Sequence, residues 1–154
     1  MPGIWPSREE SGRKTKVQYH EVRQLVFESV VVYVSYGEIC VVDDDAPTLK
    51  AVGRLLSSAN WETKTFSDPQ EFLRYSNAQR PLLAVIDVCM PAMNGLEVQS
   101  RLREISPTTR VIIFTGRESE LDCVAAFRAG AVAFFNKPFD HDEFLAAVDA
   151  ALRT

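Results

Sequence analysis

Four short apolar runs in this chain each end at side chains that could take part in chemistry. Residues 39–42 are followed by Asp43-Asp44-Asp45, residues 82–86 by Asp87, residues 111–114 by Thr115, and residues 131–135 by Asn136-Lys137. Carboxylates are ligands for a hard divalent cation, and a hydroxyl and an ammonium can bind phosphoryl oxygens. If the four run ends meet in space, they suit a divalent cation and a phosphoryl group.

The elements that carry these residues alternate along the chain. Runs of four to six apolar residues rich in Val, Ile and Phe are typical of fully buried strands in a parallel sheet. Residues 61–66 form a weaker, more polar run, as expected of an edge strand. Helical spacing and capping residues predict helices over about 47–59, 68–77, 119–129 and 140–152, and another between Gly95 and Pro107. Five strand-helix units therefore predict an α/β fold with a doubly wound parallel sheet.

In an open α/β sheet, ligands bind outside the carboxyl ends of the strands. Asp43, Asp44 and Asp87 would then repel one another, because two carboxylates ~5 Å apart at an effective dielectric of ~20 cost about 3 kcal/mol. Without a cation, at least one of their pKa values should be raised. Mg²⁺ would relieve the repulsion. A carboxylate in line with a metal-bound phosphoryl group can attack it and form an aspartyl phosphate.

The chain divides at about residue 37. Residues 38–154 contain the whole strand-helix pattern and are predicted to form one globular domain. Residues 1–37 are predicted to be an N-terminal extension, with residues 1–16 disordered because they are polar. Residues 17–36 are β-branched and aromatic. They fit an additional strand or helix, a dimerisation arm, or a non-native segment left by cloning or by a start codon placed too far upstream.

Charge and cysteine content narrow the function classes. The chain has a net charge of −4, and residues 38–154 carry 12 Lys and Arg against 17 Asp and Glu, so direct nucleic-acid binding is not expected. The three cysteines lack metal-site spacing, and unpaired thiols favour a reducing compartment. No apolar run approaches the roughly 20 residues of a membrane span, and no secretory signal is recognisable. We therefore expect a cytoplasmic protein that does not enter the membrane.

Residues 38–154 resemble the receiver domain of two-component response regulators, and the motif wording is most similar to the FixJ-like branch. The motifs, in chain order, are Val41-Val42-Asp43-Asp44-Asp45, Ile86-Asp87-Val88-Cys89-Met90-Pro91-Ala92-Met93-Asn94-Gly95, Phe114-Thr115-Gly116 and Asn136-Lys137-Pro138-Phe139. Asp87 precedes Thr115 by 28 residues and Lys137 by 50, as in that family. The resemblance implies a flavodoxin-like (βα)5 receiver fold with five parallel strands in the order 2-1-3-4-5.

The resemblance also implies a metal and phosphorylation site. Asp87 would be the phosphoacceptor and a ligand of Mg²⁺. Asp44 would bind the ion directly, and Asp43 would bind it or position its waters. The backbone carbonyl of Cys89 would be a further ligand, so that its thiol need not take part. The alternatives are that Asp43 and Asp44 only cap the first helix, as Asp45 is expected to do, and that Asp87 only ends a strand.

Three further residues would complete the site and its switch. By resemblance, Lys137 would pair with one phosphoryl oxygen, the Thr115 hydroxyl would donate a hydrogen bond to another, and Phe134 would be the aromatic switch residue. The Lys137-Pro138 bond would be cis. The alternatives are a solvated surface charge for Lys137, a turn residue for Thr115 and a core residue for Phe134.

The function implied by the resemblance is a signalling switch and not an enzyme. The chain would take a phosphoryl group from a sensor histidine kinase or a phosphotransfer protein onto Asp87. It would catalyse only this transfer and its own dephosphorylation. The modification would change the face formed by the fourth helix, fifth strand and fifth helix, and thereby the binding of an output protein, an output domain or a second copy in a phosphorylation-dependent homodimer. A stand-alone receiver and a part of a longer regulator both fit the sequence.

Two other functions fit part of the pattern. The first is an interaction module that works without phosphorylation. The full acidic set is an argument against it, and absence of Mg²⁺ binding would favour it. The second is a phosphatase with an Asp nucleophile, similar to haloacid dehalogenase-type hydrolases. Asp43 and Asp45 match the two Asp of its Asp-x-Asp-x-Thr motif, but Pro47 stands where Thr belongs.

Overall fold

The structure is a computed structural model that describes residues 21–27 and 30–153. From residue 39 onward, strands and helices alternate five times, as predicted. The strands are β3 (Ile39–Val42), β4 (Thr63–Phe66), β5 (Leu83–Asp87), β6 (Arg110–Thr115) and β7 (Ala133–Asn136). The helices are α2 (Ala46–Ser58), α3 (Pro69–Gln79), α4 (Gly95–Ile105), α5 (Glu120–Arg128) and α6 (His141–Arg153).

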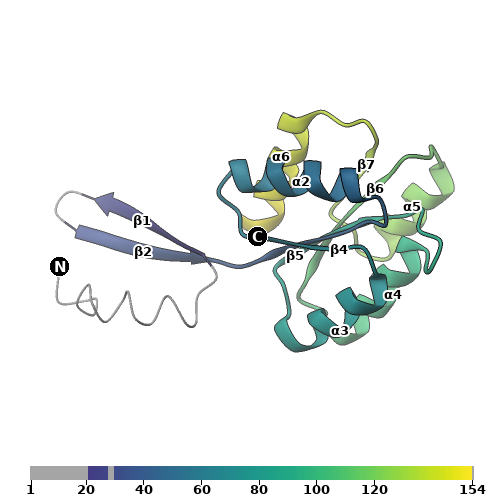
Figure 1. The fold of residues 1–154 in the computed structure, drawn as a ribbon, viewed down its shortest axis with the longest axis horizontal. Coiled ribbons are helices and arrows are strands. Elements are labelled where there is room, and N and C mark those ends of the chain that lie inside the picture. Colours follow the sequence, from purple (N-terminus) through teal and green to yellow (C-terminus); the bar gives the residue numbers. More distant parts are fainter. Residues whose placement is uncertain (1–20, 28–29, 154) are drawn as a thin grey trace.

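The five strands form one parallel sheet in the order β4-β3-β5-β6-β7 (Figure 1). Numbered from β3, this is the order 2-1-3-4-5, so the predicted topology is confirmed. The chain passes from β3 to β4 on one side and then crosses back to β5 on the other. The topological switch point therefore lies between the neighbouring strands β3 and β5, whose carboxyl ends are where a ligand site is expected.

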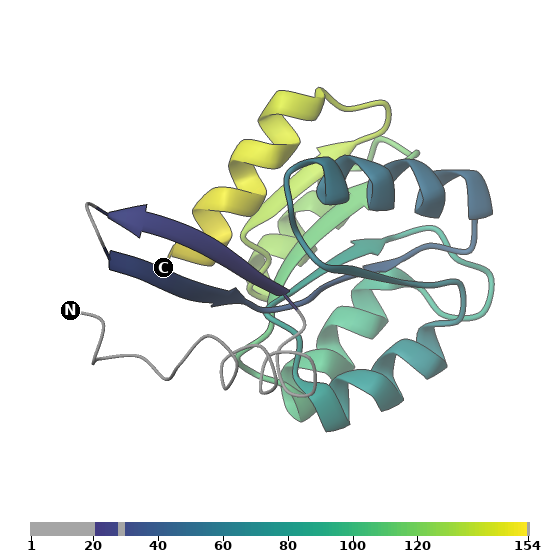
Figure 2. The ribbon, with the colours of Figure 1, turned by 60° about the vertical axis from the view of Figure 1, so that its left-hand side comes forward.

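Helices cover both faces of the sheet. Figure 2 shows α2 (blue) and α6 (yellow) on one side and α3 and α4 (teal) on the other. Leu56 of α2 and Phe144 of α6 belong to one hydrophobic core, whereas Phe72 of α3, Leu102 of α4 and Ala126 of α5 belong to the second. The central strand β5 is buried along its whole length. The carboxyl end of β5 is therefore held by packing on both faces.

Side-chain caps fix where the helices begin. Asp45 accepts a hydrogen bond from the backbone N–H of Thr48 at 3.1 Å and caps α2, as predicted. Asp68 caps α3, and Ser119 caps α5. Gly130 follows α5 with φ of 98°, the left-handed conformation expected for the residue after a helix. These local signals explain why the helix positions could be predicted from the sequence.

The strand predicted over residues 131–135 differs from the prediction in its bounds and in its burial. It begins at Ala133, and its residues are half-buried or exposed, so the prediction of a fully buried strand is wrong here. The reason is its position. β7 is an edge strand that pairs only with β6, and the neighbouring helix α5 contributes a single buried residue, Ala126. The apolar composition of this run resembles that of a central strand, so composition alone does not show that the strand lies at the edge of the sheet.

The segment before the sheet forms two strands. β1 (Glu21–Phe27) and β2 (Val30–Tyr36) pair antiparallel, and this hairpin extends away from the sheet in Figure 1. Residues 21–27 and 30–36 are thus strands and not a helix, whereas a dimerisation arm and a non-native segment stay open as interpretations. The predicted disorder of residues 1–16 concerns residues outside the described ranges. Among the helices of the described residues, none is long and apolar enough to span a bilayer.

Candidate functional site

Three carboxylates meet at the switch point of the sheet. Asp43 directly follows β3, and Asp87 is the last residue of the adjacent strand β5. Ligand oxygens of Asp43, Asp44 and Asp87 all lie within 4.8 Å of one another. Asp43 and Asp87 are only 1% and 3% exposed, whereas Asp44 is exposed to solvent. The acidic cluster is therefore buried on the sheet side and open on the side of Asp44.

Lys137 reaches into this cluster from the loop after β7. Its Nζ lies 2.8 Å from Asp43 Oδ2 and 3.2 Å from Asp87 Oδ1, and it also lies 4.5 Å from the centre of the Phe114 ring. Burial disfavours the charged form of Lys137. The hydrogen bond to Asp43 and the charges of Asp43 and Asp87 outweigh this effect and raise the pKa of the ammonium. Lys137 therefore stays cationic and neutralises one of the carboxylates.

Asp87 is the carboxylate of the cluster whose pKa is raised. Burial, followed by the charge of Asp43, raises its pKa to about 6, although Lys137 acts in the opposite direction. This is a raised pKa of the kind that the sequence led us to expect. Asp87 Oδ1 is buried and lies at ion-pair distance from Lys137, but it has no hydrogen-bond partner among the described residues. Lys137 shares its charge between Asp43 and Asp87 and lies nearer to Asp43, so the negative charge of Asp87 is only partly compensated.

The donor set fits a hard divalent cation. When ionised, three carboxylates and one ammonium leave a formal charge of −2, and all the available ligand atoms are oxygens. Asp43 already uses both oxygens, because Oδ1 accepts the N–H of Asp45 at 2.9 Å and Oδ2 binds Lys137. Asp44 and Asp87 are therefore the carboxylates best placed for direct ligation. Asp45 is not part of the cluster and caps α2.

The loop after Asp87 folds back so that Gly95 lies against the backbone of Asp87 and Val88. The N–H of Gly95 donates to the carbonyl of Val88 at 2.9 Å, and Asn94 caps α4 by accepting from Leu96 N–H at 2.8 Å. A Cβ atom at residue 95 would lie 2.0 Å from the carbonyl oxygen of Asp87. Only glycine allows this approach. The Asn-Gly pair that served as a motif thus has a physical role, which is to start α4 against the end of β5.

Thr115 ends β6 beside the acidic cluster. It is fully buried, and its Oγ1 accepts the backbone N–H of Arg117 at 3.1 Å. The same oxygen lies 3.5 Å from Sγ of Cys89, an exposed residue two positions after Asp87. Phe134 pairs in register with Ile113 on the neighbouring strand and is half-buried against the core that includes α4 and α5. The Lys137-Pro138 bond is cis.

The structure brings together four of the predicted site residues, namely Asp43, Asp44, Asp87 and Lys137. Thr115 is connected to Asp87 through the loop that carries Cys89, and Phe134 lies one strand further along the sheet. The aromatic ring of Phe114 beneath Lys137 and the side-chain contact of Cys89 were not expected. Phe114 is the last residue of an apolar run, but the apolar pattern does not predict that Lys137 will lie over its ring.

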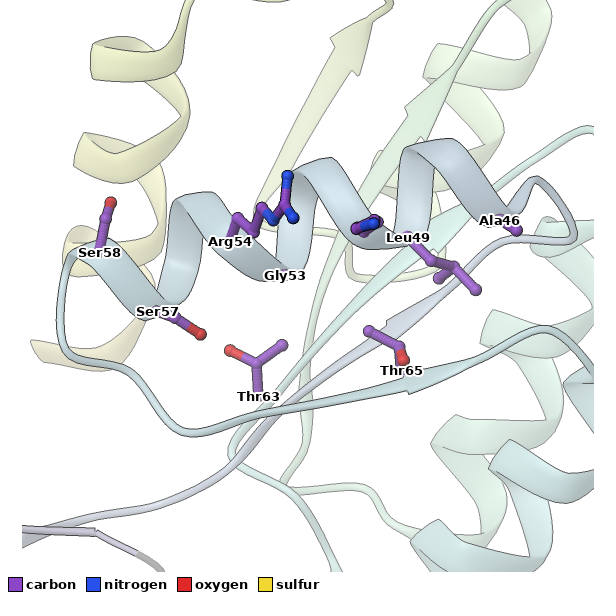
Figure 3. Close-up of a pocket in the computed structure, with 9 residues that line it drawn as sticks. Ala46, Leu49, Gly53, Arg54, Ser57, Ser58, Thr63 and Thr65 are labelled. Carbon is purple, nitrogen blue, oxygen red and sulfur yellow. The ribbon is translucent and has the colours of Figure 1, made fainter.

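A separate groove of about 790 Å³ lies between α2 and β4 (Figure 3). Lys50 and Arg54 of α2 and Thr63 and Thr65 of β4 are among its lining residues. None of the three clustered carboxylates lines it. The acidic cluster is therefore an open site at the edge of the sheet and not part of this groove.

Comparison with known proteins identifies the relatives of this chain. The family described as response regulator receiver domain matches residues 39–149. The response regulator protein TodT of Pseudomonas putida is 37% identical over 115 residues, which cover 75% of this chain and 51% of TodT. The chain spans about half the length of the first curated relatives that it matches.

Solved structures agree with this match. A CheY-like receiver domain protein from Methanospirillum hungatei has a TM-score of 0.73 and 27% identity, and the alignment covers 77% of this chain and 95% of that one. The beryllofluoride-activated NtrC4 receiver domain dimer has a TM-score of 0.72 and 28% identity, with 75% and 96% covered.

Proposed function

This chain belongs to the response regulator receiver domain family, a signalling phosphoacceptor module, and we propose that its phosphoacceptor is Asp87. One observation carries the assignment. Asp87 is a buried carboxylate at the end of the central strand, where Asp43, Asp44 and Lys137 converge on it. The phosphoryl donor would be the phosphohistidine of a sensor histidine kinase or of a phosphotransfer protein. We place the protein in the cytoplasm, which its three free cysteines support.

The positions of the residues support the following course for the proposed transfer. A carboxylate oxygen of Asp87 attacks phosphorus, and the bond to the donor histidine nitrogen breaks with its electron pair remaining on that nitrogen. Lys137 then pairs with a phosphoryl oxygen, and Asp43 keeps the ammonium in position. Asp44, Asp87 and the backbone carbonyl of Cys89 would hold Mg²⁺. The chemistry that this ion supplies is neutralisation of negative charge on the phosphoryl group.

Phosphorylation by acetyl phosphate in the presence of Mg²⁺ tests this assignment. The wild-type protein should gain the mass of one phosphoryl group, and the Asp87→Asn variant should gain none, because an amide is not a competent nucleophile here. Asp149→Asn is a matched control, since Asp149 is half exposed and pairs with Arg153 on α6. Intact mass spectrometry gives the result. Equal labelling of wild type and Asp87→Asn would show that Asp87 is not the acceptor.

We further propose that phosphorylation alters binding at the face formed by α5, β7 and α6. Among residues 37–153, five large hydrophobic side chains are exposed, and four of them lie on α5 or directly before β7, namely Leu121, Val124, Phe127 and Val132. Exposed apolar patches of this kind mark interaction surfaces. The occupant would be an output protein or a second copy of the chain, and the dimeric state of the activated NtrC4 receiver domain supports the second alternative.

Thr115 should couple phosphorylation to this face through Phe134. A phosphoryl oxygen offers the Thr115 hydroxyl a charge-assisted hydrogen bond, and the movement of Thr115 changes the space beside β7. The Thr115→Ala variant should still be phosphorylated on Asp87 but should lose most of the structural response. NMR shifts of α5, β7 and α6 on addition of beryllofluoride and Mg²⁺ measure that response. Wild-type shifts in the variant would remove Thr115 from the coupling.

Residues 1–36 should be dispensable for phosphorylation, because the receiver domain that we propose comprises residues 38–154. A chain that begins at Gly37 retains Glu38, which is buried and accepts a hydrogen bond from the Tyr75 hydroxyl. It should be labelled by acetyl phosphate at the same rate as the full chain. A shortened chain that is folded by circular dichroism but is not labelled would show that the N-terminal segment contributes to the site.

A further inference from the structure

The hydroxyl hydrogen of Thr115 has a restricted choice of partners. Thr115 is fully buried, so water cannot accept this hydrogen. Its oxygen already accepts the backbone N–H of Arg117. Among the described residues, the other recorded polar neighbour of the hydroxyl is Sγ of Cys89, at 3.5 Å. A buried hydroxyl without an acceptor is unfavourable, so the contact with Cys89 has an energetic consequence.

Burial decides which of the two groups donates. Cys89 is exposed, and its S–H can donate to solvent. Thr115 has no such alternative. The arrangement that satisfies both groups is therefore donation from the Thr115 hydroxyl to the Cys89 sulfur. Sulfur is a weak acceptor, so this hydrogen bond orients the Thr115 hydroxyl, but little free energy is needed to break it when a stronger acceptor is present.

We propose that the Cys89 side chain is a positioning residue that holds the Thr115 hydroxyl in the unphosphorylated state and so sets the balance between the resting and activated forms. This inference rests on the proposed function of Asp87 and Thr115. Thr115 has one hydroxyl hydrogen and two competing acceptors, which are the sulfur of Cys89 before phosphorylation and a phosphoryl oxygen afterwards. The chemistry of residue 89 determines how strongly the first acceptor competes.

Removal of the sulfur should favour the activated form. In a Cys89→Ala variant, the buried Thr115 hydroxyl loses its acceptor in the resting state only. Beryllofluoride, which mimics the phosphoryl group, should then bind more tightly, with its half-saturating concentration lowered about two- to fivefold. Cys89→Ser restores an acceptor at this position and should return the affinity toward the wild-type value.

The same substitution in a Thr115→Val background separates this role from a general effect on the site. Valine has a similar shape but no hydrogen to donate, so Cys89→Ala should leave the affinity unchanged in that background. Binding is measured by fluorine NMR of the bound beryllofluoride in Mg²⁺, which does not depend on the structural response. A fluorine signal that also requires Asp87 shows that the probe occupies the proposed site.

Each outcome has a definite meaning. Tighter binding by Cys89→Ala that disappears in the Thr115→Val background supports the proposal. An unchanged affinity in Cys89→Ala, or an equal change in both backgrounds, overturns it while the proposed function stands. If wild-type protein binds no beryllofluoride at all, the proposed function fails, and the role of Cys89 fails with it.

Discussion

Asp87→Asn should stabilise the metal-free protein at pH 7.5 by about 2–3 kcal/mol and should have little effect at pH 4. The cause is the raised pKa of Asp87, which is about 6 in the folded protein against 3.8 for the unperturbed group. The folded state therefore retains a proton that the unfolded state has already lost. As pH rises from about 4 to 6, ionisation of Asp87 favours unfolding, and this loss of stability persists at higher pH.

Thermal unfolding in EDTA at the two pH values measures this effect. At pH 7.5 the melting temperature of Asp87→Asn should exceed that of wild type by on the order of 5–10 °C. Asp149→Asn should behave as wild type at both pH values, because Asp149 is half exposed and lies on α6, away from the acidic cluster. On the proposed function, Mg²⁺ should narrow the difference, since an ion held by the folded wild-type cluster would stabilise the wild-type protein. A stabilisation of the same size at pH 4 and pH 7.5 would exclude the charge of Asp87 as its cause.

The positions of several site residues could be predicted from the sequence because they directly follow buried strands. Buried parallel strands leave their carboxyl ends at one edge, so a polar residue directly after an apolar run has a known position. This rule predicts where Asp43, Asp87 and Thr115 lie, whereas their expected roles came from the resemblance to receiver domains. The strand ends follow from local periodicity, which short segments encode, whereas the order of the strands was expected from the family resemblance.

Side-chain contacts are the part that the sequence did not reveal. Which carboxylate binds Lys137 depends on the path of the loop after β7, and Asp43 takes the shorter contact because its other oxygen is fixed by the N–H of Asp45. The contact between Cys89 and Thr115 likewise depends on how the loop after Asp87 folds onto β5. No period or motif describes such contacts.

The sequence left open whether residues 17–36 form a strand or a helix. Residues 30–34 are apolar without interruption, so the run lacks the alternation that distinguishes a half-buried strand. The edge position of β7 could not be predicted either, because this strand contains two aromatic residues although it pairs with one neighbouring strand only. In both segments, composition indicates a strand but does not say what covers it.

Lys137→Met should lower the stability of the metal-free protein at pH 7.5 by about 2–3 kcal/mol. Lys137 is the cation that pairs with both Asp43 and Asp87, so its removal leaves two buried carboxylates that face each other without compensation. Loss of one partner from a buried ion pair costs about 3–5 kcal/mol. We expect a cost in the lower part of this range or slightly less. The Lys137 side chain is 23% exposed, so solvent weakens the ion pair, and Asp87 can take up a proton when the ammonium is absent.

Urea unfolding at several pH values separates this electrostatic cost from the loss of packing. The loss of stability in Lys137→Met should be smaller at pH 5, where Asp87 is largely protonated in the folded state. It should also be smaller in Mg²⁺, because an ion bound to the acidic cluster would supply positive charge to the same oxygens. It should also be smaller in an Asp87→Asn background, where one carboxylate is absent. Lys50→Met is the matched control, because Lys50 lines the groove between α2 and β4, away from the acidic cluster. If both lysine variants lose the same stability at every pH, then the positive charge of Lys137 is not what holds Asp43 and Asp87 together.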